Sequence, residues 1–162
     1  MSESLENFTN IVKEDIKEAK TLFFSEAFKE EYLKDRREEK ELYHQLLLGR
    51  NRNQILEEFL LSSGQKKPVL LSAAKTIYQA TIMNLDEPLE IKVKREGWGY
   101  LVGRIKSDGT FLSLHKNTFQ AEDFEDGTLT IYADMKTIPK DGDIDHLIIQ
   151  TVYQTLQMEV VY

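Results

Sequence analysis

The spacing of apolar residues changes once along this chain, and that change constrains the fold more than any other feature. Before the stretch 62–68 apolar residues recur every three or four positions, and after it they alternate with polar residues. The first spacing is that of one face of a helix, and the second is that of a strand. The stretch itself, Ser-Ser-Gly-Gln-Lys-Lys-Pro, concentrates residues that end helices. The sequence therefore predicts a helical segment over 1–63 and a strand-rich domain over 64–162.

The helical segment is rich in residues that favour helices. Residues 1–63 contain no proline and a single glycine, and Glu, Lys, Leu and Arg are abundant. That glycine, Gly49, suits the left-handed position after a helix, and Asn53 suits the cap of the next one. The charged run 34–41 is typical of a solvated helical surface. We predict about three helices, of which the middle one is long.

The second part alternates apolar and polar residues in several short runs. The clearest are Leu89–Val93, Leu129–Tyr132 and Leu147–Thr151. Turn sequences that contain Gly, Asp or Pro separate such runs roughly every ten residues, which is typical of an antiparallel sandwich. The last helix should end between Leu60 and Gly64, and the first strand should begin near Val69.

Part of this region resembles a known fold family. The segments that carry the resemblance are Pro88–Val93, Gly97–Gly103, Ser107–Leu114, Gly142–Thr151 and Gln154–Val160. In this order they resemble bacterial immunoglobulin-like sandwich domains of large, poorly characterised multidomain proteins. The resemblance covers 68–162 and implies a fold but no activity. The expected class is α+β, with an N-terminal helical segment followed by an antiparallel immunoglobulin-like β-sandwich. The resemblance also raises the hypothesis that the chain is part of a larger bacterial protein.

Composition argues against several functional classes. The 28 acidic and 21 basic residues give a formal charge of −7, which argues against a nucleic-acid partner. The sequence contains no cysteine, so disulfides, thiolate metal sites and cysteine nucleophiles are excluded. The first residues lack the pattern of a signal peptide, and no apolar run is long enough to insert into a membrane. We therefore expect a cytoplasmic protein.

Catalytic motifs are missing from the sequence. Its three histidines, His44, His115 and His146, lie in different segments. The sequence contains no Gly-x-Ser-x-Gly elbow, no His-Glu-x-x-His helix and no phosphate-binding Gly-x-x-x-x-Gly-Lys loop. We predict that the protein is not an enzyme and needs no cofactor.

Three aspartates resemble the first half of a calcium loop. Asp141, Asp143 and Asp145 place carboxylates at alternate positions, but the positions that require glycine and glutamate hold His146 and Val152. We interpret this stretch as an acidic hairpin turn whose second and third aspartates face solvent, with a surface cation site as the alternative. Chelators should accordingly leave the stability of the protein unchanged.

Trp98, the only tryptophan, and Tyr100 are the aromatic candidates for a site. Trp98 either anchors the core of the sandwich or forms, with Tyr100, a stacking platform for carbohydrate or peptide. If the ring is a core anchor, Trp98→Ala should cost roughly 3–5 kcal/mol of unfolding free energy.

An apolar stripe in the helical segment is the candidate surface for a protein partner. Its members are Leu42, Leu46, Leu47, Ile55, Phe59 and Leu60. Short amphipathic helices must bury such a face, either on the sandwich or on another chain. We predict a non-catalytic protein-interaction or scaffolding module whose partner is a protein or a neighbouring domain. The alternative is a β-sandwich that binds a carbohydrate or peptide ligand.

Overall fold

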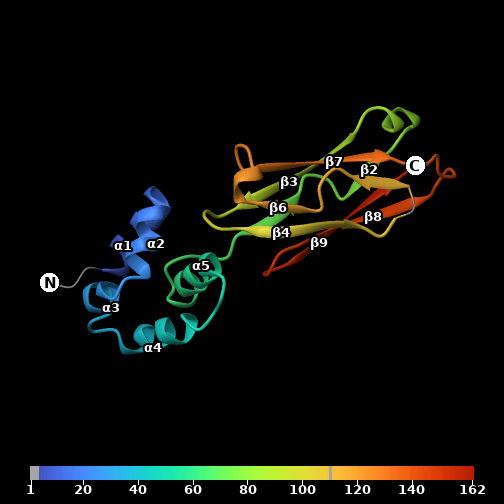
Figure 1. The fold of residues 1–162 in the computed structure, drawn as a ribbon. Helices are drawn as coiled ribbons and strands as arrows, with labels where there is room; N and C mark the ends of the chain where they lie inside the picture. Colours follow the sequence, from blue (N-terminus) through green and yellow to red (C-terminus); the bar gives the residue numbers. More distant parts are fainter. Residues whose placement is uncertain (1–3, 110) are drawn as a thin grey trace. The chain divides into compact units, whose positions relative to one another are not determined.

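The chain forms a helical unit and a β-sandwich, so the predicted α+β class is confirmed (Figure 1). The computed structural model describes residues 4–109 and 111–162. Residues 1–3, where the predicted helical segment starts, and Thr110, within one predicted motif, lie outside the described residues. The helical unit comprises the chain up to Pro68 together with Trp98–Tyr100, and the sandwich comprises Val69–Gly97 and Leu101–Tyr162.

The helical unit has five helices in its described part, not the three that the sequence predicted. They are α1 (Leu5–Glu14), α2 (Ile16–Phe23), α3 (Ala27–Tyr32), α4 (Arg37–Leu46) and α5 (Arg52–Ser62). The first break arises because the Asp15 side chain caps α2, accepting a hydrogen bond from the N–H of Glu18 at 3.1 Å. The second break lies at Arg36, which precedes α4. Its non-helical conformation divides the long helix that we predicted.

The connection between α4 and α5 corrects two details of the sequence analysis. Asn51, not Asn53, caps α5, because its side chain accepts a hydrogen bond from the N–H of Gln54 at 3.1 Å. Gly49 is not left-handed. A Cβ at this position would lie 3.2 Å from the side chain of Ile55, so the glycine permits close approach to α5.

Aromatic rings form much of the core of the helical unit. The rings in contact are Phe8, Phe23, Phe28, Tyr32, Tyr43 and Phe59. Edge and tilted contacts predominate, as the quadrupole of the rings favours. The hydroxyl of Tyr43 donates to the carbonyl of Phe23 at 2.5 Å, and burial raises the pKa of this hydroxyl.

The sandwich consists of two sheets joined by short turns. Its elements are β1 (Leu70–Ala73), β2 (Ile77–Gln79), η1 (Ile82–Leu85), β3 (Leu89–Glu96), β4 (Val102–Ser107), β5 (Leu112–Leu114), β6 (Thr118–Gln120), η2 (Ala121–Asp123), β7 (Thr128–Met135), β8 (Ile144–Gln150) and β9 (Thr155–Val161). One sheet has the order β1-β3-β7-β5 and the other β2-β9-β8-β4-β6. Among the described pairs, β2 and β9 run parallel and the others antiparallel.

Alternation along the strands places the core between the two sheets. In β7, Leu129 and Ile131 are buried while Tyr132 is exposed, and β8 buries Leu147 and Ile149. This arrangement confirms the expected immunoglobulin-like sandwich. Residues that face outward from β4, β6 and β8 share one surface of the second sheet.

Candidate functional site

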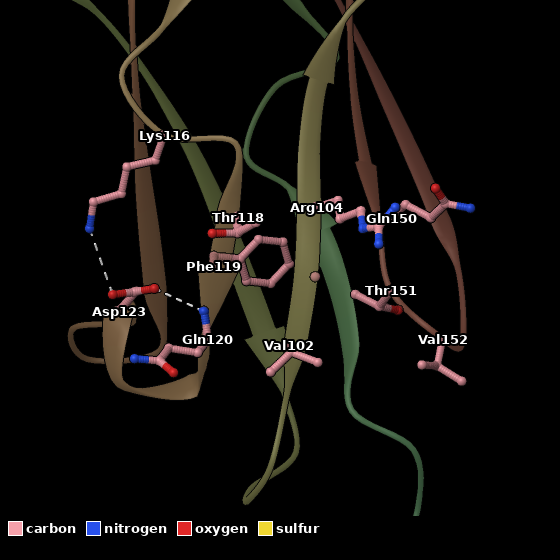
Figure 2. Close-up of a pocket in the computed structure, with 11 residues that line it drawn as sticks. Val102, Arg104, Lys116, Thr118, Phe119, Gln120, Asp123, Gln150, Thr151 and Val152 are labelled. Carbon is pink, nitrogen blue, oxygen red and sulfur yellow. Dashed lines mark hydrogen bonds and ion pairs between the residues drawn. The ribbon is translucent and has the colours of Figure 1, made fainter. Parts of the chain in front are cut away.

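An open groove of about 810 Å³ lies along β4, β6 and the end of β8. Its outward-facing side chains are Val102, Arg104, Thr118, Gln120, Gln150 and Val152 (Figure 2). They mix β-branched apolar groups with carboxamides and one guanidinium. We call this surface the β4–β6 groove.

Gly103 and Phe119 hold the two strands of the groove close together. They are directly opposite in the register of β4 and β6, and the buried ring of Phe119 lies beside β4 (Figure 2). A Cβ on Gly103 would lie 2.2 Å from this ring and 2.8 Å from the carbonyl oxygen of Gln150. The ring therefore occupies the space that a side chain at Gly103 would need, which is a known use of aromatic side chains beside strand glycines.

Two turns shape the rim of the groove. The N–H of Gln120 donates to a carboxylate oxygen of Asp123 at 2.8 Å, and Lys116 lies 3.9 Å from the other oxygen (Figure 2). At the opposite rim, Thr151 Oγ1 accepts hydrogen bonds from the two N–H groups that follow Val152, and Val152 itself is 69% exposed. The groove therefore presents exposed valines beside side-chain carboxamides.

The groove has no catalytic arrangement in the described part of the chain. Among the residues that the structure describes, no three His, Asp or Glu side chains lie together as metal ligands. The groups of the β4–β6 groove can donate and accept hydrogen bonds. The buried hydroxyl of Thr151 accepts from two backbone N–H groups, and the acid and base of the lining, Asp123 and Lys116, are not buried.

Trp98 and Tyr100 lie in the helical unit, although they fall between two strands in the sequence. The half-buried ring of Trp98 packs against the aromatic core of that unit, so its predicted role as a sandwich core anchor is wrong. The ammonium groups of Lys66 and Lys13 lie 4.4 and 5.0 Å from the centre of the ring. Tyr100 is half-buried, and its hydroxyl lies 3.4 Å from the side-chain nitrogen of Asn51. A ligand-binding role for the two rings stays a prediction.

The position of Trp98 depends on a buried ion pair that sequence reasoning missed. Lys66 Nζ lies 2.6 and 2.8 Å from the two carboxylate oxygens of Glu57 and 2.5 Å from the carbonyl oxygen of Trp98. The side chains are 0% and 3% exposed. Gly99 is left-handed, with φ of 90°, and a Cβ there would lie 2.9 Å from Nζ. Lysine and glutamate are seldom fully buried, so no sequence signal indicated this pair.

The three aspartates of the predicted cation site do not form a ligand set. Asp145 is fully buried, not solvent-facing as predicted, because the alternation of β8 turns its side chain inward with Leu147. Its Oδ2 accepts hydrogen bonds from the N–H groups of Phe111 and Leu112 at 3.2 and 2.9 Å. Asp143 is exposed and accepts a bond from the N–H of Lys140, and Asp141 is exposed on the same turn.

A surface pair lies next to Asp145. The carboxylate of Asp108 accepts a hydrogen bond from the N–H of His146 at 2.8 Å and also lies 2.8 Å from His146 Nδ1. The backbone bond, helped by the imidazole, lowers the pKa of Asp108 below its usual value. This pair ties the turn after β4 to β8.

The apolar stripe predicted to bind a partner is largely inside the helical unit. Ile55, Phe59 and Leu60 are core residues, with exposures of 6%, 0% and 1%, while Leu42 and Leu46 pack against that core. Leu47 alone of the six is exposed, at 38%. The interpretation as a partner surface is therefore wrong for most of the stripe, because the five helices bury it among themselves.

The chain thus combines a helical unit with an immunoglobulin-like sandwich that carries an open groove. The chain belongs to the family described as "Family of unknown function (DUF5717) N-terminal", whose model matches residues 2–162. No curated protein matches the chain. Within the described residues, no helix has the length and apolar character needed to cross a membrane.

Several solved structures are similar to part of the chain. The E. coli chaperone DraB is 5% identical, with 57% of this chain and 53% of that chain covered and a TM-score of 0.40. The D00-D0 domain of Intimin is 10% identical, covering 59% and 46%, with a TM-score of 0.40. The Calx CBD1 domain in its apo form is 11% identical, covering 59% and 97%, with a TM-score of 0.40. The matched region thus spans about half the length of the first two structures.

Proposed function

We propose that this protein is a protein-interaction module and that its sandwich holds a partner protein in the β4–β6 groove. The observation that carries the proposal is the groove itself, which is about 810 Å³ in volume and combines exposed valines with carboxamide and guanidinium groups. Burial of the valines would supply affinity, and the amides would satisfy the polar groups of a partner. The cytoplasmic location and bacterial origin that the sequence led us to expect remain part of this proposal.

The carbohydrate alternative has less support. It requires an accessible aromatic face, whereas the rings of Trp98 and Tyr100 are half-buried and Trp98 has two lysine ammonium groups near its ring. In the proposed function, the sandwich binds the partner, and the helical unit is a folded domain that precedes it in the sequence.

Site-specific cross-linking tests the proposal. A photoreactive amino acid at position 152 should form a discrete adduct with a cellular protein, and Arg104→Glu in the same chain should abolish it. The matched control is the same photoreactive group at Ile138, which is 61% exposed but does not line the groove. Equal adducts at both positions, or an adduct that survives Arg104→Glu, would contradict the groove as the binding surface.

A further inference from the structure

Arg104 lies at the centre of the β4–β6 groove. It pairs with Thr118 of β6 on one side and with Gln150 of β8 on the other, so the three side chains form a row across the sheet. Directly opposed side chains of neighbouring strands have Cβ atoms about 5 Å apart. All three side chains are exposed on the same face, and Figure 2 shows the guanidinium extending from β4 toward Gln150. A group that binds the guanidinium is therefore also within reach of a hydroxyl and a carboxamide.

The guanidinium of Arg104 has no counter-charge in the groove. Among the described residues that line the groove, Asp123 is the one acid. Its carboxylate accepts a hydrogen bond from the N–H of Gln120 at 2.8 Å and lies 3.9 Å from the ammonium group of Lys116, so it is already engaged. In the part of the chain that the structure describes, Arg104 forms no ion pair with a carboxylate. The lining therefore holds one paired and one unpaired cation.

The next outward residue of β4 adds to this positive charge. Lys106 is exposed on the same face as Arg104, and it too forms no ion pair within the described residues. Two acids further along this face, Asp108 and Glu159, instead contact the imidazole of His146. The surface around Arg104 therefore presents positive charge, although the whole chain has a formal charge of −7.

A partner that covers the groove must neutralise this cation. Val102 lies two residues before Arg104 on the same face of β4, and Val152 lies two residues after Gln150. The two valines are 38% and 69% exposed. A segment that buries them also removes water from the guanidinium, and a charge that is buried at an interface without a counter-charge is costly. The hydroxyl of Thr118 and the carboxamide of Gln150 can form hydrogen bonds but carry no charge. The partner must therefore supply an anionic group.

We propose that the β4–β6 groove binds an aspartate or glutamate side chain of the partner, and that its carboxylate forms a two-point ion pair with Arg104. This geometry matches the planar fork of a guanidinium. The side chains of Thr118 and Gln150 donate to the same carboxylate. An apolar side chain two residues away in an extended partner segment covers Val102, because side chains two residues apart on a strand are separated by about 7 Å on both chains. The inference rests on the proposed interaction function and specifies the chemistry of its partner.

Binding of model peptides to the full chain tests the inference. The probe is the peptide Ser-Val-Ser-Asp-Ser-Val-Ser, capped at both ends so that the aspartate carries its one charge. Its controls replace the aspartate by asparagine or by lysine. NMR should show shifts of the Arg104 Nε–H and of the Gln150 side-chain amide with the aspartate peptide, which should bind at least tenfold more tightly than either control. Raising the ionic strength from about 0.1 M to about 1 M should reduce this preference, because salt screens an ion pair.

Variants separate the contribution of Arg104 from that of the general positive charge. Arg104→Gln should lower the affinity for the aspartate peptide to that for the asparagine peptide. Arg104→Lys keeps the charge but loses the planar fork, and it should give an intermediate affinity. The matched control is Lys106→Gln, which removes a charge from the same face of β4 outside the groove lining and should leave the affinity within threefold. All three variants replace an exposed side chain, so the sandwich should stay folded.

Three results would overturn the inference: no binding of the aspartate peptide, equal affinity for the aspartate and asparagine peptides, or an affinity that Arg104→Gln leaves unchanged. Cross-linking at position 152 tests the proposed function separately. A discrete adduct there, together with equal peptide affinities, would keep the groove as a binding surface and remove the carboxylate from it. A preference for the aspartate peptide without an adduct would support carboxylate binding at Arg104 and count against the proposed cellular partner.

Discussion

The helical unit and the sandwich each bury a carboxylate, and they stabilise it in different ways. In the helical unit, Glu57 pairs with the ammonium group of Lys66, so a second charge is buried with it. In the sandwich, Asp145 accepts hydrogen bonds from the backbone N–H groups of Phe111 and Leu112. An ion pair depends on both charged partners, whereas backbone amides stay in place when the side chain changes. The two sites should therefore respond differently to substitution.

The largest effect is expected in the helical unit. Glu57→Leu leaves the Lys66 ammonium buried without its counter-charge and should lower the unfolding free energy by about 3–5 kcal/mol. Trp98 belongs to the same unit, so its fluorescence follows the transition during denaturation. The double variant Glu57→Leu with Lys66→Met should recover most of the loss. A double variant no more stable than Glu57→Leu would show that the pair contributes more than charge compensation.

In the sandwich, Asp145→Ala should cost less, about 2–3 kcal/mol, because it leaves two buried N–H groups without an acceptor. Asp145→Asn retains an acceptor oxygen and should cost less than the alanine variant. Urea unfolding followed by circular dichroism measures both. If the asparagine variant is as unstable as the alanine variant, the charge of Asp145, and not its hydrogen bonds, holds the turn.

Trp98→Ala should have a smaller effect than the sequence led us to expect. A fully buried aromatic ring is worth roughly 3–5 kcal/mol, but this ring is half-buried and should contribute about 1–3 kcal/mol. Thermal unfolding followed by circular dichroism gives the value. A loss above that range would mean that the ring also holds the Lys66–Glu57 pair in place. In that case the losses of Glu57→Leu and Trp98→Ala would not add up in the double variant.

The order of helices and strands was predictable from the sequence, but the number of helices and the position of Asp145 were not. The change of spacing near residue 64 predicts helices and then strands. Burial of one face requires apolar residues every three or four positions in a helix and at every second position in a strand. Helix number was not predictable in this way, since Asp15 looks like part of a charged helix face until its capping bond is seen. Asp145 occupies an inward-facing position of β8. Because two other aspartates lie close to it in the sequence, the pattern indicated a solvent-exposed turn instead.

The candidate sites were less predictable than the fold. The β4–β6 groove depends on strand order, because β6 leaves the sheet of β5 and β7 to pair with β4. No local pattern in the sequence specifies that crossing. The burial of Lys66 likewise depends on a loop more than thirty residues away in the sequence, which supplies the carbonyl of Trp98.

The smallest expected effect concerns the exposed neighbour of Asp145. Because hydrogen bonds from His146 lower the pKa of Asp108 in the folded state, this group stabilises the fold above its ordinary value of 3.8. As the pH falls below 3.8 and passes the lowered pKa, Asp108 is protonated in the folded state as well, and this contribution should disappear. The stability difference between the wild-type protein and Asp108→Asn should therefore be present at about pH 5, above that ordinary value, and should shrink as the pH falls below it. Urea midpoints at a series of pH values measure this difference. A gap that persists unchanged in acid would mean that Asp108 acts through its shape and hydrogen bonds alone, as a neutral amide would. In that case the surface pair would resemble the buried Asp145 in mechanism and not the ion pair of the helical unit.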